Sequence, residues 1–303
     1  MLLITIWPIF ALICVGFVLA RRAFPSADFW PAAERINYFL LFPALLISSL
    51  AKAPVYDPGV LRLGAAAAAT IVIAAVALGF ARRIRPAPAA RFGPFLQGVV
   101  RFNTYLALSI LAVFAGAEGL ERAAVYLAVA VPLGNVLSII ALTGGAPGSR
   151  APLAIMRVVF RNPLILACLA GFALALAGIG LPFGTGDFLA LLGQGSLPLG
   201  LLCIGAALKP GALRQDLSGM VAASFLRLLL MPVLAAMTGA LFGLAEVEML
   251  ALIVFSAVPA ATTSYVLTRQ LNGDGTFMAG IVTLQTVAAA LTIPLVLWVL
   301  GAQ

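Results

Sequence analysis

Apolar segments long enough to cross a lipid bilayer recur along almost the whole chain. A membrane-spanning helix needs about 20 mainly apolar residues, and breakers such as "RRIRPAPAAR" and "TGGAPGSRAP" separate the segments found here. Composition agrees, since 63% of the 303 residues are hydrophobic and only 9% are charged. The chain is therefore predicted to be an all-α polytopic membrane protein, with one membrane domain over residues 1–303. The predicted ten transmembrane helices are 3–20, 36–51, 60–80, 94–115, 122–143, 158–179, 188–208, 219–243, 248–270 and 277–300.

The basic residues are unevenly shared between the two sides of these predicted helices. The richer side holds 13 of the 18 Lys and Arg residues, and the other side holds only Lys52, Arg62 and Arg122. Cytoplasmic loops carry an excess of Lys and Arg, so we expect the richer side to be cytoplasmic and both termini to lie on the non-cytoplasmic side of the inner membrane. The net charge of +8 thus indicates topology rather than nucleic-acid binding. The 13 residues are Arg21, Arg22, Arg35, Arg82, Arg83, Arg85, Arg91, Arg150, Arg157, Arg161, Lys209, Arg214 and Arg269.

Self-similarity divides the chain into two halves. The stretch "PIFALICVG" at 8–16 matches "PLILACLAG" at 163–171 at an offset of 155 residues. Each half, about 1–145 and 155–303, would contain five helices, and an odd number makes the second half enter the membrane from the opposite side. We therefore predict two inverted five-helix repeats.

The stretch "AVPAATTSY" places helix-breaking and polar residues at the centre of the predicted helix 248–270. Pro259 has no N–H for the carbonyl of Phe255, so the helix should break there. The helix that follows would offer N–H groups and hydroxyls that suit an anion. At an offset of 157, Pro259 corresponds to position 102 beside Asn103, near the centre of 94–115. The predicted substrate-binding residues are Asn103, Thr104, Pro259, Ala260, Thr262, Thr263 and Ser264.

Two other readings of these polar residues stay open. Pro259 could simply kink a packed helix whose hydroxyls bond to carbonyls one turn back. Asn103 could bond to a neighbouring helix.

Charged residues inside the predicted helices are few. Arg101 and Arg227 are the two that lie well inside, and both could attract an anionic substrate or extend to the cytoplasmic surface. None of the ten carboxylates lies near the middle of a predicted helix, and the chain has no histidine. The sequence thus predicts no embedded acidic relay, no catalytic residues, no metal and no cofactor, and argues against an enzyme.

Several stretches resemble the auxin efflux carrier family of bacterial and plant transporters. They are "WPIFALICVGFVLARRAF", "INYFLLFPALLISSL", the Asn of the fourth helix followed by "FAGAEGLERAAVYLAV", and "SAVPAATTSYVLTRQLNGDGTFMAGIVTLQTVAAALTIPLVLWVL". Family members commonly have Gly and Pro shortly after that Asn, whereas this chain reads "NTYLALSIL".

The resemblance implies both an architecture and a mechanism. The first, second, sixth and seventh helices would form a scaffold, and the third to fifth and eighth to tenth a transport domain. The fourth and ninth helices would be broken and would cross, with Asn103 and 259–264 at the crossing. Substrates of the family are organic anions such as auxin, malonate or malate, and the transport domain would move as an elevator.

Together these features predict a secondary transporter of small organic anions. The alternatives are a sodium-coupled carrier of the bile-acid symporter type, and a non-transporting membrane subunit or sensor. The expected partners are the organic anion and the lipid bilayer, and no nucleic acid. A coupling ion, H⁺ or Na⁺, and a homodimer are left open.

Overall fold

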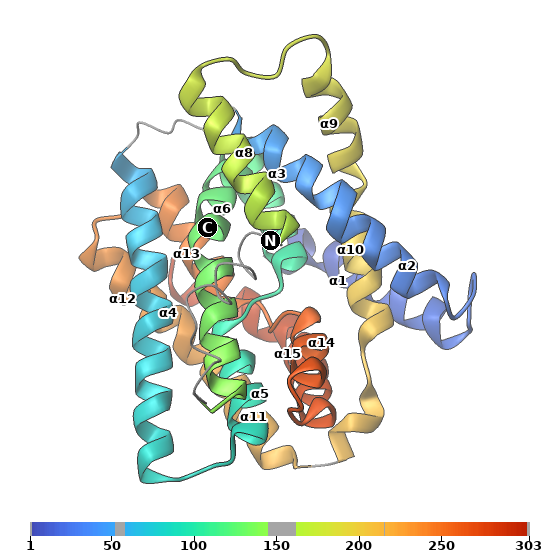
Figure 1. The fold of residues 1–303 in the computed structure, drawn as a ribbon, viewed down its shortest axis with the longest axis vertical. Coiled ribbons are helices and arrows are strands. Elements are labelled where there is room, and N and C mark those ends of the chain that lie inside the picture. The colour runs from blue at the N-terminus through green and yellow to red at the C-terminus, as the bar shows by residue number, and fades with distance from the viewer. Residues whose placement is uncertain (1, 52–57, 145–161, 215, 302–303) are drawn as a thin grey trace.

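The computed structural model describes residues 2–51, 58–144, 162–214 and 216–301, and this part of the chain is almost entirely helical (Figure 1). Lys52, Arg150, Arg157 and Arg161, which contribute to the predicted orientation, lie outside the described residues. The first half contains α1 (Leu2–Arg21), α2 (Phe29–Ile36), a π-helical turn (Asn37–Leu41), α3 (Phe42–Leu50), α4 (Pro58–Ile84), α5 (Ala89–Val100) and α6 (Thr104–Leu142). The second half contains α8 (Pro163–Ala177), α9 (Thr185–Gln194), α10 (Ser196–Ala207), a 3₁₀ turn (Pro210–Arg214), α11 (Leu217–Phe225), a second π-helical turn (Leu226–Leu230), α12 (Met231–Leu241), α13 (Glu246–Ala257), α14 (Thr263–Gln270) and α15 (Gly275–Val299).

Six helical stretches among the described residues are long and apolar enough to cross a membrane, which supports a multi-pass membrane protein. One of them, 89–142, covers two of the predicted helices, and Gly116 divides it with a φ of 55°. The described part of a further predicted helix, Pro163–Ala177, is 15 residues long. The number ten therefore stays a prediction. The six stretches are Ile4–Arg21, Pro58–Ile84, Ala89–Leu142, Thr185–Ala207, Leu217–Leu241 and Gly275–Val299.

Each π-helical turn ends two residues before a proline. The turn Asn37–Leu41 precedes Pro43, and the turn Leu226–Leu230 precedes Pro232. A proline ring presses on the carbonyl four residues earlier, and a wider turn relieves that clash without ending the helix. Helix therefore runs from Phe29 to Leu50, beginning seven residues before the predicted start at 36.

Two other interruptions do end the helix. After α5 the chain is non-helical at 101–103, and after α13 it is non-helical at 258–261. The sequence predicts an interruption at both places, at the same relative position in the two halves.

Glycines let two pairs of helices pack backbone to backbone. A Cβ at Gly16 of α1 would overlap the carbonyl oxygen of Leu202 of α10, and a Cβ at Gly171 of α8 would lie 3.4 Å from the carbonyl oxygen of Ile47 of α3. The second contact repeats the first at the predicted offset, because Gly171 lies 155 positions after Gly16 and Leu202 lies 155 positions after Ile47. Figure 1 shows α4 along one flank, α2, α9 and α10 along the other, and α5, α6, α14 and α15 between them.

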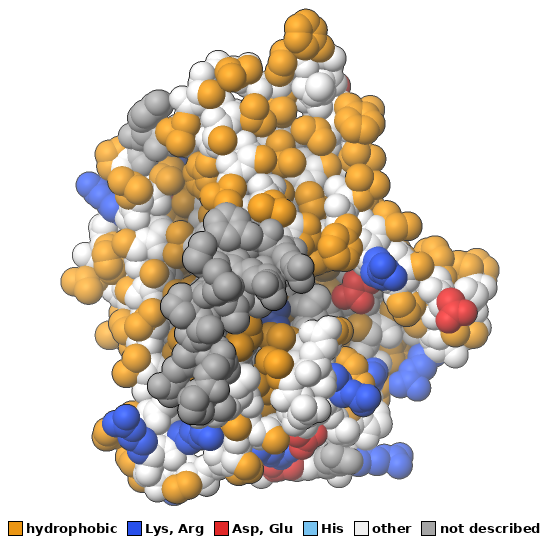
Figure 2. Space-filling view, viewed as in Figure 1, with side chains coloured by type: hydrophobic (Ala, Val, Ile, Leu, Met, Phe, Trp, Pro, Cys, Tyr) orange, Lys and Arg blue, Asp and Glu red, His pale blue; other side chains and the backbone are white. Residues whose placement is uncertain are grey.

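Large apolar side chains remain exposed on the outside of the molecule. Trp7, Phe80 and Trp298 are each more than 60% exposed, and the upper part of the face in Figure 2 is mostly hydrophobic. Most of the Lys and Arg side chains in that view gather toward its lower and right edges. Exposed apolar surface of this kind suits lipid rather than water.

Candidate functional site

The two interrupted segments contact each other directly. The backbone N–H of Asn103 donates to the carbonyl of Pro259 over 2.8 Å. Asn103 also begins α6, because its Oδ1 accepts from the N–H of Leu106 at 3.2 Å. This N-cap lets the first interruption form in a stretch that has no proline of its own.

Arg227 connects the ends of both interrupted helices. The side chain is 1% exposed, and its guanidinium donates to the carbonyls of Val99 at 3.0 Å and Val258 at 2.7 Å, and to the carbonyl of Phe255. Val99 and Phe255 lie in the last turns of α5 and α13, and Val258 is the C-cap residue of α13. The final carbonyls of a helix have no partner within it. Arg227 therefore lies behind the interruptions and satisfies their backbone.

Gln285 of α15 makes a second connection between the same segments. Its Nε2 donates to the carbonyl of Gly98 at 2.9 Å and to that of Ala223 at 3.3 Å, and its Oε1 accepts from the N–H of Ala260 at 2.8 Å. The amide thus uses both of its ends and is fully buried.

A small cavity of about 60 Å³ lies where the two interruptions meet. A single water needs about 10–15 Å³ by the same measure, so the cavity suits a ligand of a few heavy atoms. Five of the nine residues singled out in the sequence line it: Arg101, Asn103, Thr104, Thr262 and Thr263. Pro259, Ala260, Ser264 and Arg227 are not among the lining residues.

Other lining residues were not singled out as site residues in the sequence. Asn162 caps α8, accepting from the N–H of Leu164 at 2.9 Å, and Tyr38 lies in the first π-helical turn. An Asn followed by Pro before an apolar run is a helix-start signal, so Asn162 could have been placed at a helix start from the sequence. Tyr38 carries no such signal.

Arg101 brings a positive charge to the cavity wall. Its guanidinium donates to Gln97 Oε1 at 3.1 Å and to Thr263 Oγ1 at 3.2 Å. Gln97 is held in turn by a 2.9 Å bond from its Nε2 to Thr268 Oγ1. Across the described ranges no carboxylate lies within ion-pairing distance of Arg101. The site therefore carries a half-buried, uncompensated cation.

Asn103 supplies an unused hydrogen-bond donor at the same place. The side chain is 2% exposed, and its Nδ2 has no hydrogen-bond partner among the residues that the structure describes. Ser264 Oγ is also buried without such a partner. A buried polar group without a partner costs about 1–3 kcal/mol, so a ligand that accepts from Asn103 Nδ2 would recover that energy.

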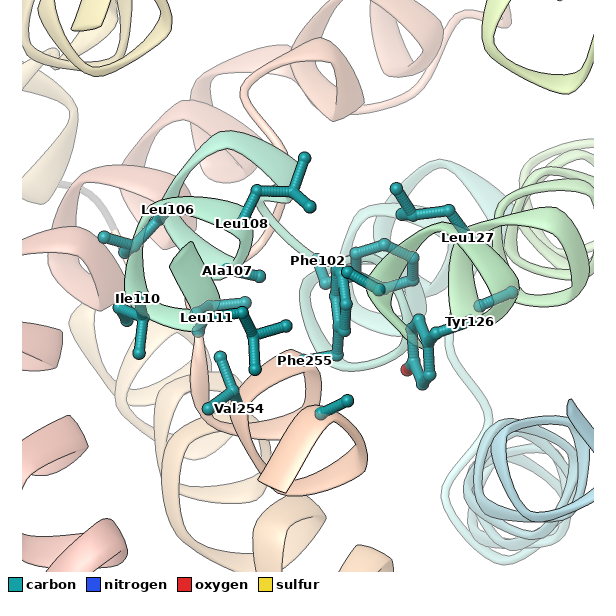
Figure 3. Close-up of a cluster of buried hydrophobic side chains, with 14 of the residues drawn as sticks. Phe102, Leu106, Ala107, Leu108, Ile110, Leu111, Tyr126, Leu127, Val254 and Phe255 are labelled. Atoms are coloured by element: carbon teal, nitrogen blue, oxygen red, sulfur yellow. The ribbon is translucent and has the colours of Figure 1, made fainter. Parts of the chain in front are cut away.

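Two further aromatic rings pack against Phe102 at the wall of the small cavity. The rings of Tyr126 and Phe255 are stacked with centroids 4.2 Å apart, and Phe102 packs edge-on against both at 5.3 and 5.2 Å. Figure 3 shows these three rings together within a larger group of buried apolar side chains. Because Phe102 also lines the cavity, part of the cavity wall belongs to a buried hydrophobic cluster.

A wider cavity, here called the vestibule, adjoins the small one. Five residues line both: Tyr38, Arg101, Asn135, Asn162 and Thr263. The vestibule also reaches Glu34 of α2, whose Oε1 accepts from Thr262 Oγ1 over a long 3.5 Å bond. Burial raises the pKa of the Glu34 carboxyl above its ordinary value, and the bond from Thr262 offsets this only in part. The sequence predicts no carboxylate at the site, but the structure places Glu34 there because α2 begins before the predicted helix.

Comparison with known proteins gives two similarities. Residues 150–297 match a family described as membrane transport protein, which confirms over that range the resemblance seen in the sequence. The chain is also 25% identical to a protein of Methanothermobacter thermautotrophicus named as an uncharacterized transporter, in a match that covers 96% of each chain. Both similarities point to a transporter rather than an enzyme.

Proposed function

We propose, from the match of its second half to the membrane transport protein family, that this chain is a secondary transporter of small organic anions. The substrates would be mono- or dicarboxylates such as malonate or malate. The small cavity at the two interruptions would bind the carboxylate.

The observation that carries this proposal is the pairing of an unused donor with an uncompensated cation. Among the described residues, Asn103 Nδ2 is buried without a hydrogen-bond partner, and Arg101 lines the same cavity without an ion-pairing carboxylate. A carboxylate is acceptor-only when ionised and bonds best to charged donors. It would supply the missing partner to both groups at once, with the hydroxyls of Thr262 and Thr263 beside it.

We further propose the inverted-repeat architecture with a scaffold and a moving transport domain. The glycine contacts that recur at an offset of 155 support equivalent helices in the two halves. The close packing of α1 on α10 and of α8 on α3 would suit a rigid scaffold formed by α1, α2, α3, α8, α9 and α10. The transport domain would comprise α4 to α6 and α11 to α15, and Arg227 and Gln285 would keep its two broken helices together during an elevator movement.

The residues that line the vestibule indicate the side of the membrane to which the proposed site would open. It is lined by Arg35 and Gln270, and the basic end of α2 and α14 is cytoplasmic under the predicted orientation. At Phe102 the small cavity is backed by the rings of Tyr126 and Phe255. The structure would thus correspond to a cytoplasm-facing state of the carrier.

Counterflow by the purified protein tests the proposed function. Proteoliposomes loaded with unlabelled malonate should accumulate external radiolabelled malonate without any other subunit. Counterflow that requires sodium would favour the sodium-coupled alternative. If a panel of mono- and dicarboxylates shows no counterflow while the protein is folded, the chain is not an organic-anion carrier, and a non-transporting subunit or sensor is favoured.

A further inference from the structure

Glu34 occupies a position that the anion site does not explain. It lies on α2, half-buried, and contacts the second interruption through Thr262. It lines both the vestibule and a neighbouring cavity of about 480 Å³ that also contains Trp30, Lys209 and Thr262. Glu34 therefore connects α2 to the start of α14 and borders two cavities.

The charged and titratable groups around Glu34 leave its charge unbalanced. Lys209 is directed to an aromatic ring, with its Nζ 4.0 Å from the centroid of Tyr265, and Arg101 is held by Gln97 and Thr263. Within the described ranges Glu34 forms no ion pair. The groups facing it are Arg35 on its own helix, Tyr38 in the π-helical turn, Arg101 and Tyr105 beside the first interruption, Cys203 on α10, Lys209 after α10 and Tyr265 on α14.

We propose that Glu34 is a proton-binding site, and that its protonation accompanies binding of the anion. This inference rests on the proposed function, because it names the ion that would be coupled to the anion. The proton would come from water in the vestibule and bind to a carboxylate oxygen of Glu34, with no other bond made or broken.

Electrostatics supplies the coupling. An ionised Glu34 on the vestibule wall repels an incoming carboxylate, whereas a protonated Glu34 does not. By reciprocity, a bound anion raises the proton affinity of Glu34 by the same factor by which the proton raises anion affinity. Couplings of this type are typically about 5–150-fold, and we expect about tenfold here. The carrier would thus take up anion and proton together.

Uptake driven by a pH gradient tests this coupling. Proteoliposomes at pH 7.5 inside receive radiolabelled malonate at pH 6.5 or 7.5 outside, with the voltage clamped by potassium and valinomycin. Wild-type uptake should rise about tenfold with the gradient. Glu34→Gln should abolish the stimulation, so that its uptake is the same at both external pH values. Both proteins see the same ionisation of malonate, so the substrate's own titration cancels in the comparison.

A matched control is the exposed carboxylate at the start of the same helix. Asp28→Asn removes one negative charge from the same region and should keep the full stimulation. Stimulation that persists in Glu34→Gln overturns the proposal, as does wild-type uptake that does not change with the pH gradient. The second result would leave the organic-anion function standing.

A readout that does not depend on transport separates the two proposals. Trp30 lies one turn before Glu34 on α2, and Trp7 and Trp298 are exposed, so Trp7→Phe with Trp298→Phe leaves Trp30 as the single reporter. Its fluorescence should titrate with a midpoint above about 4.3, the ordinary pKa of Glu, and Glu34→Gln should remove the transition. Should malonate fail as a substrate, this titration still decides the proton site, and a transition unchanged in Glu34→Gln overturns it.

Discussion

Arg227 donates through Nη2 to the carbonyl of Phe255, the acceptor that Pro259 leaves without its helical donor. The same guanidinium reaches Val99 at the end of the other interrupted helix. In a membrane, a free carbonyl costs several kcal/mol. A single buried side chain thus removes this cost at both interruptions.

Replacing Arg227 should therefore destabilise the fold rather than only weaken anion binding. Arg227→Met keeps a long apolar side chain but leaves three carbonyls without their donor, and should cost about 3 kcal/mol or more. Arg227→Lys keeps the charge but replaces the planar guanidinium with a single ammonium group. Its stability should therefore lie between that of the wild type and that of Arg227→Met. Thermal unfolding of the purified protein in detergent measures this order. A lysine variant with full stability and reduced anion affinity would instead support the anion-attraction role expected from the sequence.

Variants of Asn103 separate its two roles. Asn103→Ser keeps an N-cap acceptor for Leu106 but removes the unused Nδ2 donor. Stability should change by less than about 1 kcal/mol, while malonate counterflow should fall at least tenfold, about the loss of one charge-assisted hydrogen bond. Asn103→Asp keeps the cap and adds a negative charge, so it should transport less than the serine variant. Counterflow equal to the wild type in both would remove Asn103 from the site.

The buried ion pair between Arg122 and Glu248 should matter for stability. Glu248 Oε1 lies 3.0 Å from Arg122 Nε, and both side chains are largely buried. Removing one partner of a buried pair costs about 3–5 kcal/mol, so Glu248→Gln should lower the free energy of unfolding by about 3 kcal/mol. Glu246→Gln is the matched control, because Glu246 lies in the same first turn of α13 but is exposed. Equal effects of the two substitutions would show that the pair contributes nothing.

The contact between α1 and α10 should not tolerate a methyl group. A Cβ at Gly205 would overlap the carbonyl oxygen of Ile13, so Gly205→Ala must push the helices apart, at about 3 kcal/mol. Gly79→Ala in α4 is the control, since no atom lies within 4 Å of its added Cβ. That variant should be stabilised by up to about 1 kcal/mol through helix propensity. Comparison of the two unfolding temperatures tests the contact.

Burial of Glu34 also predicts a pH-dependent stability. A carboxyl whose folded pKa is raised destabilises the folded state once pH rises above its ordinary pKa and the group begins to ionise. Glu34→Gln should therefore match the wild type below about pH 4, the ordinary range for Glu, and exceed its stability at neutral pH. Unfolding temperatures of both proteins at pH 4 and 7.5 provide the measurement. A difference that does not change with pH would contradict a raised pKa.

The two helix interruptions could be predicted from the sequence, whereas the contacts of the residues around them could not. Pro259 and the repeat offset predict both breaks, because proline has a strict local effect and the duplication transfers it to position 102. The acceptors of Arg227 and the position of Glu34 depend on contacts between distant segments, which no local pattern encodes. The predicted helix begins at 36 and leaves Glu34 outside it, yet the helix begins at Phe29 and carries Glu34 to the site.

The bond from the N–H of Asn103 to the carbonyl of Pro259 involves only main-chain atoms. Any residue with a backbone N–H at position 103 could make it, so substitutions at the cavity wall can alter what is recognised without separating the two half-sites. The contact between the two half-sites therefore does not depend on the side chain at position 103, whereas the N-cap of α6 does. Related transporters can therefore acquire new substrates through substitutions at the cavity wall while they keep the main-chain contact between the two half-sites.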